Sequence, residues 1–163
     1  MTYDDVLIDA EKMGLIVKEK PLRGNDGRIK GKRVAIRKDL PTLKHKACVL
    51  AEEIGHYMTS AGDITSQDLA FGCQQIVLNN RKQEYRARRW GCDYLIGIDG
   101  LIRAANAGCR SMADTAEYLD VTEEYLAFAL EDFHGRYGIS TIRDNFYIQF
   151  EPYFMIVDLD AEI

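Results

Sequence analysis

The sequence predicts an α+β protein with a mostly helical body and a small antiparallel sheet. Two long segments, residues 41–60 and 74–96, repeat apolar side chains at steps of three and four, which is the spacing of an amphipathic helix. Residues 28–37 instead alternate polar and apolar side chains, as a strand does. The 163 residues suffice for one domain of ordinary size. We therefore expect one active centre in a main part at 1–138, with 139–163 as a strand-rich extension of the same domain.

Shorter patterns predict the remaining elements. Residues 15–22 are expected to pair with 28–37 as a hairpin, because the turn sequence Gly24-Asn-Asp-Gly27 lies between them. A shift of the alternation near Gly31 predicts a bulge in the second strand. Aromatic and β-branched residues in the tail predict a terminal hairpin around Pro152. Amphipathic spacing predicts further helices at 3–13, 101–108, 112–119 and 122–133.

Composition and charge exclude several classes of protein. The chain has 47% hydrophobic and 29% charged residues, as soluble globular proteins do, and no run of about 18 apolar residues that would span a membrane. Its first residues lack the basic flank and apolar run of a secretory signal, so a cytoplasmic location is expected. Four cysteines without a C-x-x-C pair predict reduced thiols. A net charge of -5 gives the whole molecule no reason to approach nucleic acid.

The first long helix carries a pattern associated with metal-dependent proteolysis. Glu52, Glu53 and His56 form E-E-I-G-H, which is the H-E-x-x-H pattern with glutamate at its first position. Side chains four residues apart stack one turn above another, so Glu52 and His56 can reach one ion from the same face. Glu53 is near enough to act as general base on a metal-bound water. The same spacing also fits an ordinary surface Glu–His pair worth roughly a few tenths of a kcal/mol.

A third ligand has to come from another part of the fold, because a catalytic zinc usually takes three protein ligands and a water. Glu84 on the second long helix is the best candidate. It shares a helix face with Ala87 and Gly91, whose small side chains would let the two helices approach closely. His45 and Cys48 lie near Glu52 on a helical wheel and are alternative ligands, although a helical cysteine is more often buried packing.

Three segments, in the same order, resemble the ImmA/IrrE family of metallo-endopeptidases. The sequence V-L-A-E-E-I-G-H-Y at 49–57 is similar to that family's A-H-E-L-G-H, and E-Y-R-A-R-R-W-G at 84–91 is similar to its E-x-x-A-x-x-F-A. The sequence A-D-T-A-E-Y-L-D-V-T-E-E-Y-L at 113–126 is similar to its I-A-x-x-F-x-V-x-x-x-x-V. The resemblance covers roughly residues 1–130 and implies a zincin-like metallopeptidase fold over the main part of the chain.

The resemblance also implies an activity and a partner. It implies one zinc ion, with His56 and Glu84 as ligands and Glu53 as the base. The substrate that the resemblance implies is a partner regulator, such as a helix-turn-helix repressor encoded nearby on a phage or mobile element. Glu52 departs from the family pattern, because it adds negative charge and weakens the ion as a Lewis acid. We predict that Glu52 still binds the ion, which would either lower the activity or shift the preference toward metals that favour oxygen ligands.

Recognition of an extended substrate is expected at a strand next to the metal helix. If 32–37 is an edge strand, its backbone would pair with the substrate, and Val34 and Ile36 would contact substrate side chains. Tyr57 follows His56 directly and is a further candidate contact, or a stabiliser of an oxyanion. An ordinary hairpin strand and a tyrosine that serves only in packing explain the same residues.

The sequence also fits two alternative functions. In one, the protein keeps a zincin-like fold but is catalytically weak or inactive and binds a repressor or antitoxin. In the other, residues 112–130 form a helix-turn-helix that binds DNA, with Ala116, Leu119 and Val121 in its core. Charge argues against DNA, since residues 110–133 contain seven acids and one base. The predicted partner is therefore a protein, and neither nucleic acid nor a membrane.

Overall fold

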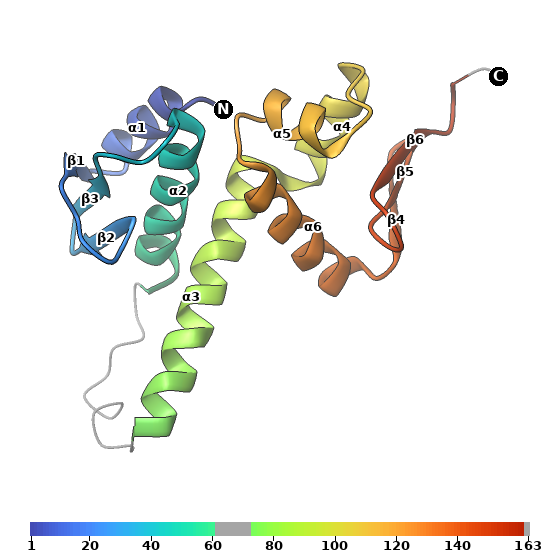
Figure 1. Cartoon of the computed structure of the whole chain (residues 1–163). Helices are drawn as coiled ribbons and strands as arrows, with labels where there is room; N and C mark the ends of the chain where they lie inside the picture. The colour runs from blue at the N-terminus through green and yellow to red at the C-terminus, as the bar shows by residue number, and fades with distance from the viewer. Residues whose placement is uncertain (61–72, 162–163) are drawn as a thin grey trace. The chain divides into compact units, whose positions relative to one another are not determined.

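The computed structural model describes residues 1–60 and 73–161 and confirms the α+β class (Figure 1). Its internal contacts divide the chain into two compact units, Met1–Gly91 and Cys92–Ile163, which we call the N-terminal unit and the C-terminal unit. The predicted division at residue 138 stays a prediction. Among the described helices, none has the length and apolar character needed to cross a membrane.

The N-terminal unit begins with helix α1 (Tyr3–Lys12), which starts at a capping box. The Thr2 hydroxyl accepts a hydrogen bond from the Asp5 backbone N–H at 3.3 Å, and the Asp5 carboxylate accepts one from the Thr2 N–H at 2.8 Å. These bonds satisfy two backbone donors that have no partner inside the helix. The helix buries Tyr3, Val6 and Ala10 on one face, as its predicted spacing requires.

Three strands follow: β1 (Ile16–Lys20), β2 (Gly27–Lys30) and β3 (Arg33–Arg37). Their order is β1-β3-β2, with β1 parallel and β2 antiparallel to β3, so the sheet is mixed. The predicted hairpin between 15–22 and 28–37 is wrong. Gly31 has a φ of +60°, and it forms a two-residue turn with Lys32 that splits the predicted second strand into β2 and β3. The shift in alternation therefore marks a turn and not a bulge.

Helices α2 (Leu43–Ser60) and α3 (Cys73–Leu95) complete the N-terminal unit, although α3 continues past its boundary. The Thr42 hydroxyl accepts a hydrogen bond from the His45 N–H at 3.1 Å, so α2 begins two residues after Pro41. Ala47, Leu50 and Ile54 are fully buried, and α2 packs against β2 and β3. Helix α2 thus lies beside a small sheet, as expected, but this sheet is mixed and the prediction of an antiparallel one is wrong, because β1 pairs parallel with β3.

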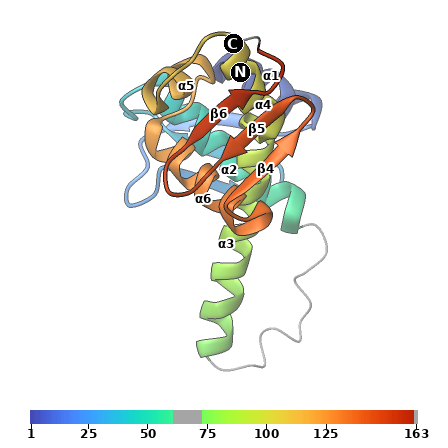
Figure 2. The same ribbon diagram turned by 90° about the vertical axis from the view of Figure 1, so that its right-hand side faces the viewer.

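The C-terminal unit contains helices α4 (Gly97–Asn106), α5 (Met112–Tyr118) and α6 (Glu123–Tyr137) and strands β4 (Ser140–Arg143), β5 (Phe146–Gln149) and β6 (Met155–Asp158). Figure 2 shows these three strands side by side, and both of their pairings are antiparallel. The β5–β6 hairpin around Pro152 confirms the prediction, whereas β4 is an additional strand. Helix α4 begins four residues before the predicted segment.

Helices α5 and α6 have the core predicted for a helix-turn-helix. Ala116, Leu119 and Val121 are at most 4% exposed, and the Thr122 hydroxyl caps α6 by accepting from the Tyr125 N–H. The exposed acids Glu123 and Glu124 occupy the first turn of α6. They would face the phosphates of a nucleic acid approaching that helix end, so this surface disfavours DNA.

Candidate metal centre

Helix α2 places Glu52 and His56 one turn apart, and both are half-buried. The third group is Glu84 on α3, whose Oε2 lies 3.2 Å from His56 Nε2. One ligand atom from each of Glu52, His56 and Glu84 lies within 4.8 Å of the others. The three side chains predicted to bind a metal are therefore gathered at one place.

The close approach of α2 and α3 depends on Gly55. A Cβ at this position would collide with the backbone carbonyl oxygen of Ala87, so the two helix backbones touch there. The predicted role of Ala87 in close packing is confirmed, since it is fully buried. The neighbour of Gly55 is thus the backbone of α3. This contact holds Glu84 near His56, because Glu84 lies one turn before Ala87.

Glu53 is buried beside the three candidate ligands, with 9% of its surface exposed. Gly27 of β2 covers it so closely that a Cβ there would lie 2.6 Å from Glu53 Oε1. Burial, the largest cause, acts together with the negative charges of Glu52 and Glu84 to raise the pKa of Glu53 to about 7. A carboxyl group in this environment can exchange a proton near neutral pH.

The pKa of Glu52 is also raised, although nearby charges of both signs act on this carboxylate. Burial raises its pKa and so does the nearby Glu84, whereas Arg88 and His56 act in the opposite direction. The Arg88 Nε lies 3.9 Å from Glu52 Oε2. Glu52 therefore has a cationic neighbour on α3 even without a metal.

The donor set fits a divalent cation. Zinc binds imidazole nitrogen and carboxylate oxygen at about 2.0–2.2 Å, which places tetrahedral ligands about 3.5 Å apart. The spread of up to 4.8 Å among the three groups is wider. The Glu84 side chain is 63% exposed, so it has room to adjust its position when an ion binds. A cation would also neutralise the repulsion between the Glu52 and Glu84 carboxylates.

Two cavities open onto this centre. The larger, of about 610 Å³, is lined by β2, by the turn after it and by Glu53, His56, Tyr57 and Glu84. The other, of about 410 Å³, lies beside the loop Gly24–Gly27 and also reaches Glu52. The candidate ligands and Glu53 are therefore accessible from the side of β2.

The predicted substrate contacts are only partly at the centre. Tyr57 lines the larger cavity. Val34 and Ile36 are 2% and 0% exposed and belong to β3, the central strand, so their assignment to an edge strand is wrong. Their side chains pack in the core beneath α2. Strand β3 is not an edge, because β1 pairs with the side that β2 leaves free.

The alternative ligands are not in the group. Cys48 is buried, and the His45 Nε2 lies 3.8 Å from Asp26 Oδ2. Among the described residues, Cys48, Cys92 and Cys109 are not in disulfide bonds, in line with the reduced state predicted for them.

The sequence did not reveal two residues of the centre. Gly27 was interpreted only as a turn residue, and its contact with Glu53 depends on the sheet packing against α2. Arg88 could have been identified from the sequence, because it follows Glu84 by four residues and so shares its helix face.

Comparisons with protein-family models, with curated proteins and with solved structures found no match to this chain. The function has to be argued from the residues and geometry of the centre itself.

Proposed function

We propose that the protein is a zinc-dependent endopeptidase that hydrolyses a peptide bond in a partner regulatory protein. One observation carries this proposal: Glu84, from a separate helix, meets Glu52 and His56 within 4.8 Å. A chance Glu–His pair on α2 would need no such third acid. The ImmA/IrrE resemblance adds support, because it assigns the metal to His56 and Glu84 independently of their distance.

The chemistry of this proposal divides between the ion and the chain. A bound divalent ion would polarise the scissile carbonyl and make an attacking water more acidic. Glu53 accepts the proton of that water and then donates it to the leaving amine. Gly27 and the burial of Glu53 hold its carboxyl group in place between these two steps.

Strand β2 is suited to bind the substrate backbone. Within the described part of the chain it pairs only with β3, and Gly27, Arg28 and Ile29 line the cavity of the centre. An extended peptide can add to such an edge through main-chain hydrogen bonds. This would bring the scissile bond close to Glu53 and His56.

The test uses metal content and cleavage together. Zinc should bind at one ion per chain to the wild type, and His56→Ala and Glu84→Ala should lose it. We expect the substrate to be a helix-turn-helix repressor encoded nearby, and wild type but not Glu53→Gln should cut it, as mass spectrometry of the fragments would show. Absence of zinc from the wild-type protein would overturn the proposal.

A second candidate is a catalytically weak or inactive protein that binds a repressor or antitoxin. The proximity of Arg88 to Glu52 favours it, since a guanidinium can take the place of a cation at that carboxylate. Stable binding of the partner with no cleavage by zinc-loaded wild type would support this alternative.

A further inference from the structure

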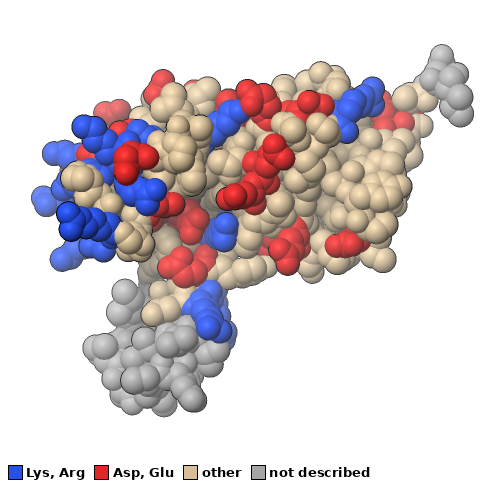
Figure 3. All heavy atoms as spheres, viewed as in Figure 1, with Lys and Arg blue, Asp and Glu red and all other residues tan. Residues whose placement is uncertain are grey.

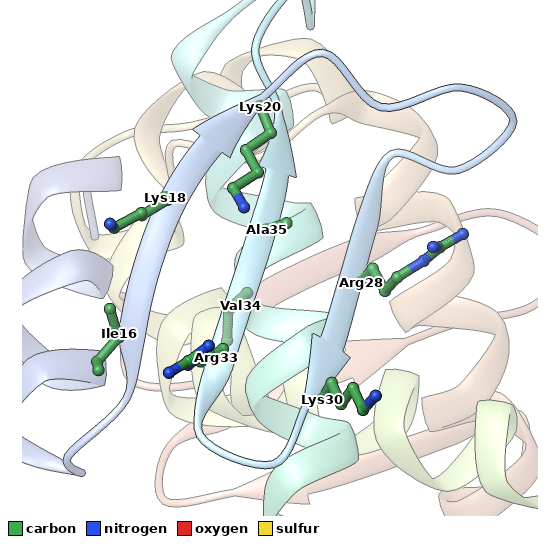
Figure 4. A pocket seen from close by; sticks show the side chains of 8 residues that line it. All are labelled: Ile16, Lys18, Lys20, Arg28, Lys30, Arg33, Val34 and Ala35. Carbon is green, nitrogen blue, oxygen red and sulfur yellow. The ribbon is translucent and has the colours of Figure 1, made fainter.

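The outer face of the N-terminal sheet carries a concentration of positive charge. Five exposed cations, which we call the basic face, rise from the three strands: Lys18, Lys20, Arg28, Lys30 and Arg33. Figure 4 shows them around Ala35, together with Ile16. These residues line a shallow cavity of about 410 Å³.

The alternation of the strands explains why the charges share one face. Successive side chains point to opposite sides of a sheet. Val34 and Ile36 of β3 are buried on the side that packs against α2, so Arg33 and Ala35 lie on the other. The basic face and the metal helix are therefore on opposite sides of the same sheet.

The charges of the basic face are not balanced locally. No ion pair is found between its five cations and any acid among the described residues. Arg37, at the end of β3, differs, since it contacts Asp26 at 2.7 Å and Asp39 at 3.1 Å. Crowding five like charges is unfavourable unless a partner of opposite charge compensates them.

The basic face also contrasts with the rest of an acidic chain. Residues 1–91 contain 17 Lys and Arg against 12 Asp and Glu, whereas residues 92–163 contain 4 against 14. Figure 3 shows Lys and Arg gathered over the part of the N-terminal unit that carries β1, β2 and β3. The positive charge is thus a local property of this sheet.

We propose that the basic face docks an acidic, partly apolar polypeptide segment of the protein that the centre cleaves. This inference rests on the proposed function and names the class of its substrate. Apolar surface lies between the cations, because Ile16 is 54% exposed and Ala35 forms part of the cavity. An amphipathic acidic segment can use both the charges and this surface, whereas a phosphate backbone uses only the charges.

Two further observations favour a polypeptide over a nucleic acid. The residues that line the cavity include no aromatic side chain on which bases would stack. The chain as a whole carries a net charge of -5, which repels a densely charged polymer more than it repels a short acidic segment.

Strand β2 connects the basic face to the centre. Arg28 lines both the cavity of the basic face and the larger cavity of the metal centre. A substrate strand added at the free edge of β2 would present alternate side chains next to Arg28 and Lys30, and opposite charges pair favourably across strands. Acidic residues at alternate positions near the scissile bond are therefore expected in the substrate.

The test measures binding and does not depend on cleavage. The probe is a labelled peptide that alternates Glu and Leu, followed by fluorescence anisotropy at low and high salt. The variant Lys18→Gln/Lys20→Gln/Lys30→Gln should bind it about tenfold or more weakly. The matched control replaces three exposed lysines outside the basic face, Lys12, Lys38 and Lys82, and should bind as the wild type does.

Other occupants would appear as distinct results that overturn the inference. Tighter binding of a labelled DNA duplex than of the peptide, lost in the same triple variant, would make the face a nucleic-acid site. Self-association at low salt, abolished by the triple variant while the peptide stays unbound, would assign the face to a second copy of the chain. If the triple variant and the control bound the peptide with equal affinity, the basic face would be excluded as the docking site.

The two proposals can fail separately. The His56→Ala variant should keep its affinity for the peptide, because the basic face contains no candidate metal ligand. Peptide binding that needs the three lysines, in a protein that holds no zinc, would overturn the endopeptidase alone. Cleavage of a partner at the same rate by the triple variant and the wild type would overturn the docking role alone.

Discussion

Gly27 of the sheet lies directly against the side chain of the candidate base, Glu53. A Cβ on Gly27 would lie 2.6 Å from Glu53 Oε1, 2.9 Å from its Cγ and 2.7 Å from Val49 Cγ1. Such distances are too short for any real contact, so the Glu53 side chain has to move when residue 27 is larger. The position of the base is thus set by a residue outside the helix that carries it.

Gly27→Ala should therefore reduce cleavage at least tenfold while zinc stays bound, because it displaces Glu53 and leaves the three ligands in place. Overpacking should also cost about 1–3 kcal/mol of stability. Kinetics and metal analysis of the same sample would check both effects. Gly135→Ala is the control, since a Cβ there meets nothing within 4 Å. An unchanged rate of cleavage by Gly27→Ala would contradict the assignment of Glu53 as the general base.

Glu52 gives a second prediction, for the choice of metal. Imidazole favours zinc, whereas carboxylate oxygen suits manganese and magnesium. Glu52→His restores the H-E-x-x-H pattern and should raise the ratio of zinc to manganese affinity on the order of tenfold. Competition titrations with a chelating dye would measure both affinities. An unchanged ratio would indicate that residue 52 does not bind the ion.

At the scale of elements, the contact between α2 and α3 determines whether the third ligand reaches the first two. Gly55→Ala forces the helices apart at Ala87, because the new Cβ would collide with a backbone carbonyl that cannot rotate away. We expect a loss of about 1–3 kcal/mol in stability and weaker zinc binding. Denaturant unfolding and zinc titration would test this. A variant that loses stability but keeps the full affinity for zinc would contradict the dependence of zinc binding on the contact between α2 and α3.

A hydrogen-bonded chain of three side chains joins α1, β1 and α2. The Tyr3 hydroxyl donates to Glu19 Oε1 at 3.3 Å, and Lys46 donates to Glu19 Oε2 at 2.8 Å. Burial, the largest cause, and the charge and hydrogen bond of Glu19 together raise the pKa of Tyr3 to about 12. A tyrosine in the unfolded chain has a pKa of about 10. The folded state therefore binds the phenolic proton more tightly than the unfolded state does.

This difference predicts an alkaline loss of stability. The contribution of the raised pKa is complete below pH 10 and is lost as the pH rises from about 10 to about 12. Tyr3→Phe should be less stable than the wild type by about 1 kcal/mol at pH 9 and should lack this loss at higher pH. Urea unfolding at pH 9 and pH 11 would show the gap between the two proteins narrowing. A constant gap would contradict the role of Tyr3.

Local patterns predicted well the parts of the structure that depend on few residues. The helix spacing of Glu52 and His56 follows from their four-residue separation, and the small residue Ala87 correctly indicated where α3 touches α2. The sheet was harder, because an alternating run does not reveal which strand it pairs with. Gly31 looks the same in sequence whether it forms a bulge or a turn, so β3 was taken for an edge strand although β1 covers its other side.

At the scale of the whole molecule, all the candidate ligands and the base belong to the N-terminal unit. The C-terminal unit has a buried core of its own, with Leu101, Leu126 and Phe133 fully buried. Binding a ligand stabilises the parts that hold it in proportion to the affinity. Loss of a metal should therefore act unequally on the two units.

Metal removal should consequently speed amide hydrogen exchange in β2, in the second half of α2 and around Glu84, and leave β4–β6 unchanged. The reason is that ligands held by an ion lose a common restraint when it leaves, and local opening then becomes easier. Hydrogen-exchange mass spectrometry of zinc-loaded and chelator-treated protein would resolve both units in one experiment. The control is His56→Ala, which is expected to bind no zinc. Any change that the chelator causes in this variant is a direct effect of the reagent and not of metal loss. If exchange became equally faster in β4–β6, the ion would stabilise both units together. The predicted difference between the two units would then be wrong.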